Sequence, residues 1–193
     1  MMIRSLITTL AFLFYFTASG QMSISNKTKA SPLDQSPLDM AYYPSDYTVL
    51  KSQDKMKDPP VARVIFSRPQ KNKRVIFGEL IEYGVVWRLG ANEATELEFF
   101  KDVKMGGKKI AKGRYTIYAI PQATEWTIII NKDTDVWGAF KYDPKKDVAR
   151  INVPVTKTTD TVEVFTMGFA KNGNGVTLNI AWDDTAVSVP FTY

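Results

Sequence analysis

Residues 162–182, VEVFTMGFAKNGNGVTLNIAW, decide the fold, because they hold two apolar runs on either side of a turn. Both runs are rich in β-branched and aromatic residues, which favour strands. Between them, the sequence KNGNG at 171–175 supplies Asn and Gly for the positive φ angles of a tight hairpin turn. The stretch therefore predicts an antiparallel hairpin. Its second strand is expected to point four residues inward, namely Val176, Leu178, Ile180 and Trp182.

Short strands of the same kind are expected from Val61 to the end of the sequence, without a long helical stripe of apolar residues. In the first of them, Phe66 faces the core and Ser67 faces the other side. The pair Gly106-Gly107 predicts another tight hairpin turn, and a short run at 85–88 leads into a polar segment. Together with these, the full set of expected strands is 62–67, 74–81, 96–101, 114–120, 126–131, 149–155, 162–169, 175–182 and 187–191.

About nine strands without intervening helices predict an all-β fold, a single antiparallel β-sandwich that is jelly-roll-like or a flattened barrel. A parallel α/β sheet is disfavoured, because parallel neighbours need a crossover helix between them.

The first residues are typical of a secretory signal peptide. Arg4 precedes an apolar run at 6–16, which is far shorter than the roughly 20 residues that span a bilayer. Small residues follow, so we expect cleavage between Gly20 and Gln21, a signal peptide at 1–20, and a periplasmic or secreted protein with no membrane span after cleavage. An uncleaved membrane anchor is the alternative.

Residues 21–39 read as a flexible leader, since they are rich in Ser, Lys, Asp and Pro and contain Ser-Pro-Leu-Asp twice. The tyrosine-rich stretch 40–47 carries enough apolar surface to pack on the domain. We therefore expect a single β-sandwich domain at 40–193.

The chain contains no histidine and no cysteine, which excludes Ser-His-Asp and Cys-His catalysis, thiolate or imidazole zinc sites, and disulfides. Any catalysis would have to use carboxylates, Lys, Tyr, Arg or a metal held by oxygen. The net charge of +5 is mild, and the bases stand in small groups beside turn signals, where lysines keep loops and sheet edges solvated. The functional alternative to this solvating role is that the bases bind an anionic polymer of the cell envelope. Nucleic acid is not an expected partner.

The segment 87–95, WRLGANEAT, interrupts the strand pattern with a dense group of polar residues. In a clamp, Arg88 would bind Glu93 or backbone carbonyls, and removing one partner would cost about 3–5 kcal/mol. In a site, Arg88, Asn92 and Glu93 would converge on a polar ligand. The candidate ligand-binding residues are Arg68, Arg88, Asn92, Glu93 and Trp137.

The four tryptophans are expected in two different environments, a ligand-binding surface and the hydrophobic core. Trp87 or Trp137 would offer a stacking surface to a ligand, whereas Trp126 and Trp182 lie on apolar strand faces and are expected in the core.

Glu93 is a weak candidate for a catalytic acid, with Asp133, Asp135 or Asp183 as a guessed second carboxylate. The stretch 131–135, NKDTD, resembles the start of a calcium loop, but Val136 stands where that loop needs glycine. Asx turns explain the same residues, so we expect no metal site and no cofactor.

Several of these stretches together resemble an exported bacterial family known as domain of unknown function 2911, over roughly residues 36–190. The resemblance implies export and a compact single domain, and it brings no reaction or catalytic residue. It is carried by RVIFSRP at 63–69, IFGE at 76–79, VWRLGANEAT at 86–95, GRYTIYAIP at 113–121 and WTIIINKDTDVWG at 126–138.

The sequence thus predicts an exported soluble β-sandwich that binds a glycan or another cell-envelope component. The alternatives are a structural or interaction module of the envelope without a ligand, and a carboxylate-dependent hydrolase centred on Glu93. Enzymatic activity is not the favoured interpretation, and the sequence does not indicate the oligomeric state.

Overall fold

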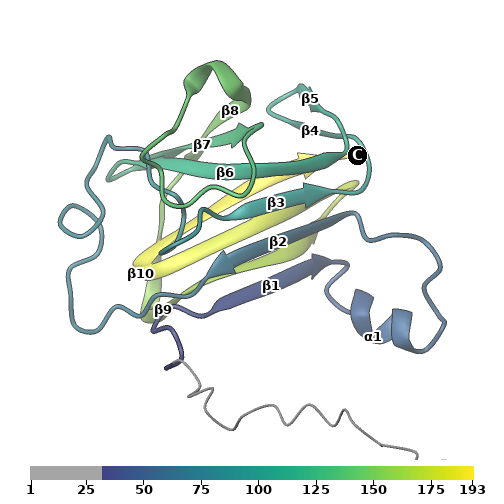
Figure 1. Cartoon of the computed structure of the whole chain (residues 1–193), viewed down its shortest axis with the longest axis horizontal. Helices are drawn as coiled ribbons and strands as arrows, with labels where there is room; N and C mark the ends of the chain where they lie inside the picture. Colours follow the sequence, from purple (N-terminus) through teal and green to yellow (C-terminus); the bar gives the residue numbers. More distant parts are fainter. Residues whose placement is uncertain (1–31) are drawn as a thin grey trace, which may run out of the picture. The chain divides into compact units, whose positions relative to one another are not determined.

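The computed structural model describes residues 32–193, so the predicted signal peptide, its cleavage site and leader residues 21–31 lie outside the described residues. Residues Leu33–Tyr193 form one unit of two antiparallel sheets, which confirms the predicted β-sandwich (Figure 1). The helices of the described residues include none that is long and apolar enough to span a membrane.

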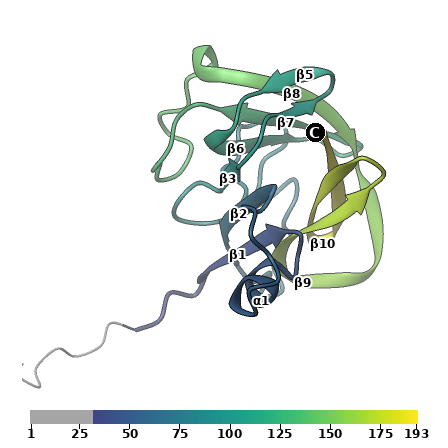
Figure 2. The ribbon, with the colours of Figure 1, turned by 90° about the vertical axis from the view of Figure 1, so that its right-hand side faces the viewer.

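The larger sheet has six strands in the order β1-β2-β3-β6-β7-β8, and the smaller has four in the order β5-β4-β10-β9. Figure 2 shows the long β9–β10 ribbon lying against the larger sheet. The strands of the larger sheet are β1 (Leu38–Tyr43), β2 (Ala62–Ser67), β3 (Glu96–Phe99), β6 (Gly113–Pro121), β7 (Glu125–Asn131) and β8 (Asp147–Pro154). Those of the smaller sheet are β4 (Val103–Met105), β5 (Lys108–Ile110), β9 (Thr156–Asn172) and β10 (Gly175–Thr192).

Two short helices complete the described elements, α1 (Tyr47–Ser52) and the 3₁₀ turn η1 (Pro144–Lys146). The tyrosine-rich stretch packs on the domain as expected, because β1 pairs with β2 at the edge of the larger sheet and α1 follows it.

The β9–β10 hairpin forms at the predicted turn, with Gly175 opposite Asn172, but both strands are much longer than expected. The predicted strand at 187–191 is not separate and continues β10. Register shifts around Asp183 explain the error. Before them the buried residues are even-numbered, 176 to 182, and after them odd-numbered, 185 to 191. A bulge that moves the inward face by one residue breaks the alternation without ending the strand.

The predicted strand at 74–81 is wrong. These residues belong to the long connection 68–95 between β2 and β3, and they form turns with one isolated bridge, Phe77 to Ile81. Their apolar character has another cause, since Ile76 is fully buried and Phe77 packs against the core from the loop. The run at 85–88 contributes only the bridge between Trp87 and Ala119.

An aromatic cluster fills the core between the sheets. Trp87 stacks on Trp182 with ring centroids 6.1 Å apart, and Trp126 lies edge-on to Trp87 at 5.8 Å. Phe77 and Phe165 also contact Trp87, at 5.9 and 5.4 Å. The core positions of Trp126 and Trp182 are confirmed, whereas Trp87 is buried and offers no stacking surface to a ligand.

Hydrogen bonds from buried hydroxyls hold the connection 87–95 on the sheet. The hydroxyl of Ser67 donates to the carbonyl of Ala91 and accepts from its amide, both at 2.6 Å. The hydroxyl of Thr95 donates to the carbonyl of Leu89. Ser67 and Thr95 are each only 1% exposed. Ser67 does face away from Phe66, but it is buried because this connection covers it.

Gly90 allows the connection to approach β2 this closely. Its φ of +149° suits glycine alone, and a Cβ there would lie 2.6 Å from the Ser67 hydroxyl oxygen.

We expect Ser67→Ala to lower the free energy of unfolding by roughly 1–3 kcal/mol, because both polar groups of Ala91 lose their partner. Urea unfolding measures the loss. Ser188→Ala is the matched control, since the Ser188 hydroxyl donates to Asn179 on the exposed side of β10 and its removal should cost less than about 0.5 kcal/mol. Equal losses in the two variants would contradict the role given to Ser67.

Candidate functional site

The five predicted ligand-binding residues do not share one cavity. Arg88 lines two adjoining cavities, and Glu93 and Trp137 line a different one. Arg68 forms an ion pair with Asp39 of β1 at 2.9 Å.

Asn92 serves the backbone of its turn. Its φ is +58°, a left-handed conformation that Asn tolerates better than most residues, and its carbonyl accepts from the amide of Gly138 at 2.9 Å.

The predicted clamp between Arg88 and Glu93 is not formed. Among residues 32–193, no ion pair includes Arg88 or Glu93, whose side chains also show no hydrogen bond. The clamp of this segment consists instead of the Ser67 and Thr95 hydroxyls, which leaves both charged side chains free.

A short backbone pairing brings Glu93 beside Trp137. The amide of Ala94 donates to the carbonyl of Val136 at 2.8 Å, and residue 93 bridges to residue 137. Glu93 and Trp137 thereby line a common cavity of about 410 Å³, together with Leu38, Ile65, Ala94, Glu96, Asp135 and Val136.

Trp137 and Phe140 form an exposed aromatic pair, which we call the aromatic platform. Trp137 is 62% exposed and Phe140 80% exposed, and their rings stack 5.8 Å apart at 23°. Gly138 permits this contact, because its φ is +73° and a Cβ there would lie 2.5 Å from the Phe140 ring. Large apolar side chains exposed side by side mark interaction surfaces in soluble proteins.

Phe140 was not among the ligand-binding residues predicted from the sequence. The available signal was the order Trp137-Gly138-Ala139-Phe140, in which a glycine stands between two aromatics outside any strand pattern.

Glu93 is the free carboxylate at this surface. Glu96 and Asp135 line the same cavity, but Arg114 pairs with both of them, at 3.4 and 2.5 Å. Asp135 also donates its amide to Glu96 at 2.8 Å. Glu93 alone is therefore available to accept hydrogen bonds from a ligand without first breaking an ion pair.

The loop that carries the aromatic platform is anchored at its base. The side-chain amide of Asn131 donates to the carbonyl of Asp143 and to Asp147, at 3.0 and 2.8 Å. Its oxygen accepts from the amide of Asp133 at 3.0 Å, which is the Asx turn expected for 131–135. The carboxylate of Asp133 pairs with Lys146 at 2.7 Å.

Two tyrosines also stabilise the lower end of the loop that carries the aromatic platform. Tyr142 donates to Asp147 at 2.7 Å, and its ring packs edge-on against Tyr118 at 5.2 Å. Burial is the main cause that raises the pKa of each to about 12, so both hydroxyls stay protonated at neutral pH.

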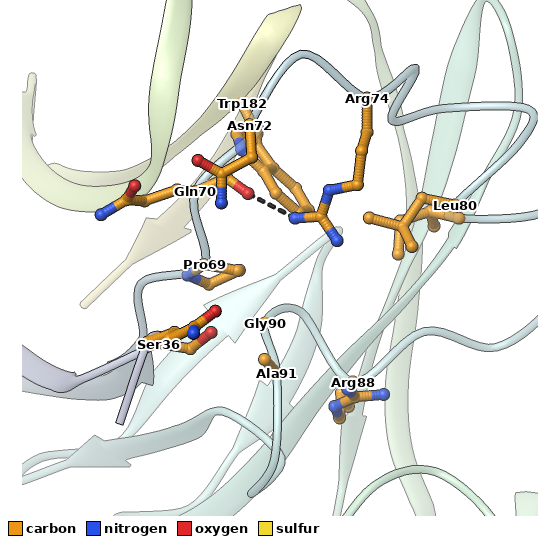
Figure 3. Close-up of a pocket in the computed structure, with 12 residues that line it drawn as sticks. Ser36, Pro69, Gln70, Asn72, Arg74, Leu80, Arg88, Gly90, Ala91 and Trp182 are labelled. Atoms are coloured by element: carbon orange, nitrogen blue, oxygen red, sulfur yellow. Dashed lines mark hydrogen bonds between the residues drawn. The ribbon is translucent and has the colours of Figure 1, made fainter. Parts of the chain in front are cut away.

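The cavity at Arg88 has a volume of about 280 Å³ and different chemistry (Figure 3). Arg74 and Arg88 reach it from the two halves of the connection 68–95, and Gln70 and Asn72 are also among its lining residues, although the side-chain amide of Gln70 points away from Arg74. No Asp or Glu is among its lining residues. Arg74 was missed because the sequence reading placed it at the start of a strand.

Comparison with known proteins agrees with the resemblance seen in the sequence motifs. None of the curated proteins and none of the solved structures compared with the chain matches it. A family model does match residues 51–191, which include all ten strands except β1 and the end of β10. The chain therefore belongs to the family described as Protein of unknown function (DUF2911).

Proposed function

We propose that this domain is a binding module that recognises a glycan of the cell envelope through the aromatic platform and Glu93. The observation that carries the proposal is the exposure of the stacked pair Trp137 and Phe140, 62% and 80%, next to a cavity that contains a free carboxylate. Exposed aromatic rings of this size are costly to leave in water without a partner.

The chemistry of a sugar fits this surface. The C–H face of a pyranose ring is apolar and packs on an indole or phenyl ring, while its hydroxyls donate to carboxylates. Trp137 offers the ring and Glu93 the acceptor from adjacent, paired backbone positions. Lys141 lines the neighbouring cavity under Phe140 and adds a donor for ring and hydroxyl oxygens.

The predicted signal peptide supports the envelope as the place of action. An exported protein in the periplasm or outside the cell meets peptidoglycan and surface polysaccharides. The predicted location would therefore place the aromatic platform where glycans are present.

Two other functions would use the same surface differently. An interaction module would cover the aromatic platform with another protein instead of a sugar. A glycosidase would need a second carboxylate beside Glu93, and the two that line the cavity, Glu96 and Asp135, both form ion pairs with Arg114. This pairing favours recognition over hydrolysis.

Trp137→Ala and Phe140→Ala should each abolish binding to an array of bacterial envelope polysaccharides and peptidoglycan fragments. Because both side chains are exposed, the free energy of unfolding should change by less than about 0.5 kcal/mol. Tyr83→Ala removes a partly exposed aromatic elsewhere and should bind as the wild type does. A wild-type protein that bound nothing on the array would contradict the proposal.

Glu93→Gln should weaken binding of the same glycan about 10-fold, since a charge-assisted hydrogen bond becomes a neutral one. Isothermal titration calorimetry measures the change. If instead the wild type released new reducing ends from the glycan and Glu93→Gln did not, the domain would be a hydrolase and the binding proposal would fail.

A further inference from the structure

The cavity at Arg88 shares no lining residue with the cavities of the aromatic platform. We propose that it is a second binding site, which holds the oxyanion group of a small molecule, a carboxylate or a phosphate, between Arg88 and Arg74. The site goes beyond glycan recognition by the aromatic platform and rests on different residues.

Arg88 supplies the first reason. Its side chain is partly buried, it takes part in no ion pair within the described residues, and its Nε is buried without a hydrogen-bond partner. Burial lowers the pKa of Arg88, because desolvation disfavours the charged form, yet a guanidinium remains protonated at neutral pH. A buried charge without a counter-ion is costly, and an anion in the cavity removes that cost.

Arg74 supplies a second guanidinium that is already oriented. Its Nε donates to the carbonyl of Lys71 at 2.9 Å, and one terminal nitrogen donates to the carbonyl of Gln70 (Figure 3). These bonds hold the side chain over the cavity. The other terminal nitrogen, Nη1, makes no hydrogen bond or ion pair within residues 32–193 and is free for a ligand.

Two carboxylates near this cavity are engaged elsewhere, and a third, Glu82, lines an adjoining cavity that also includes Leu80, Ile81 and Arg88. Asp183 pairs with Lys71 at 3.0 Å, and the carboxylate of Glu163 accepts from the amide of Asn72 at 2.8 Å. The lining of this cavity therefore holds two guanidiniums and no carboxylate, together with the polar residues Gln70 and Asn72.

Shape and size limit the ligand. A planar guanidinium binds carboxylate or phosphate through two parallel hydrogen bonds, which a halide or a neutral sugar cannot match. The volume of about 280 Å³ suits a small molecule, and Leu80 with the edge of Trp182 supplies an apolar wall for its body. A small organic acid or phosphate, or an acidic sugar, has this combination of groups.

Isothermal titration calorimetry with glucuronate, inorganic phosphate and glucose tests the site. At least one of the two anions should bind saturably, and glucose should not. The anion that binds identifies the preferred group. Absence of saturable binding by both anions would overturn the proposal, as would equal binding of glucose and glucuronate.

Arg88→Gln and Arg74→Gln should each weaken binding of the anion at least about 10-fold, because each removes one positively charged hydrogen-bond donor. Lys145→Gln makes the same charge change on the exposed turn η1 and should leave affinity unchanged. Circular dichroism establishes that each variant is folded, and the exposed Arg74 keeps the test decisive if Arg88→Gln does not fold. Wild-type affinity in both arginine variants would overturn the proposal.

Trp137→Ala separates this site from the aromatic platform. It should lose glycan binding and keep the anion affinity of the wild type. Loss of anion binding in Trp137→Ala would contradict two independent sites, whereas glycan binding without any anion binding would overturn this inference and leave the proposed function standing.

Discussion

The buried hydroxyl of Ser67, which exchanges two hydrogen bonds with the backbone of Ala91, is the contact on which the arrangement of the connection 87–95 depends. It fixes an irregular connection against β2 without using a charge. Thr95 closes the other end by donating to Leu89. With the backbone fixed in this way, Trp87 enters the aromatic core, Arg88 turns to one cavity and Glu93 to the other.

Neutral hydroxyls make the hydrogen bonds that hold the backbone of the connection 87–95. Its charged side chains are therefore not needed for that purpose and would be available to a ligand. If Arg88 and Glu93 were paired, each would neutralise the other, and neither cavity would have its characteristic group. In the structure the cavity at Arg88 is lined by two guanidiniums and no carboxylate, and the cavity at Trp137 contains a carboxylate that no arginine pairs with. The two surfaces therefore suit ligands of different charge.

Most of the sheet could be predicted from the sequence, because alternation reports which side of a strand is buried. Leu97 and Phe99 are buried while Glu96 and Glu98 are not, and both hairpins form at their Gly-rich turns. The strand patterns failed in two ways. Alternation broke at the bulge near Asp183, where a continuous strand changes face, and the uniformly apolar run at 74–81 predicted a strand although Ile76 and Phe77 enter the core from a loop.

The sequence provides candidate residues for a site, and it could not show how they are arranged in space. Leu89 and Asn92 have left-handed φ angles of +56° and +58°, so the direction of each side chain in this segment follows no period that sequence can show. Residues five apart in the chain, Arg88 and Glu93, consequently face different cavities. Phe140 joins the aromatic platform and Arg74 joins the cavity at Arg88 only because the loops that carry them fold in a particular way.

Within the described residues, Arg88 is a cation without an ion-pair partner beside a cavity, and it is not part of the clamp. Equilibrium unfolding of Arg88→Met in urea, without added ligand, tests it most directly, since methionine keeps much of the aliphatic packing and removes the charge. We expect a free energy of unfolding within about 0.5 kcal/mol of the wild type, or above it, because no partner is lost. A loss of about 3–5 kcal/mol, as expected when one partner of a buried ion pair is removed, would contradict it.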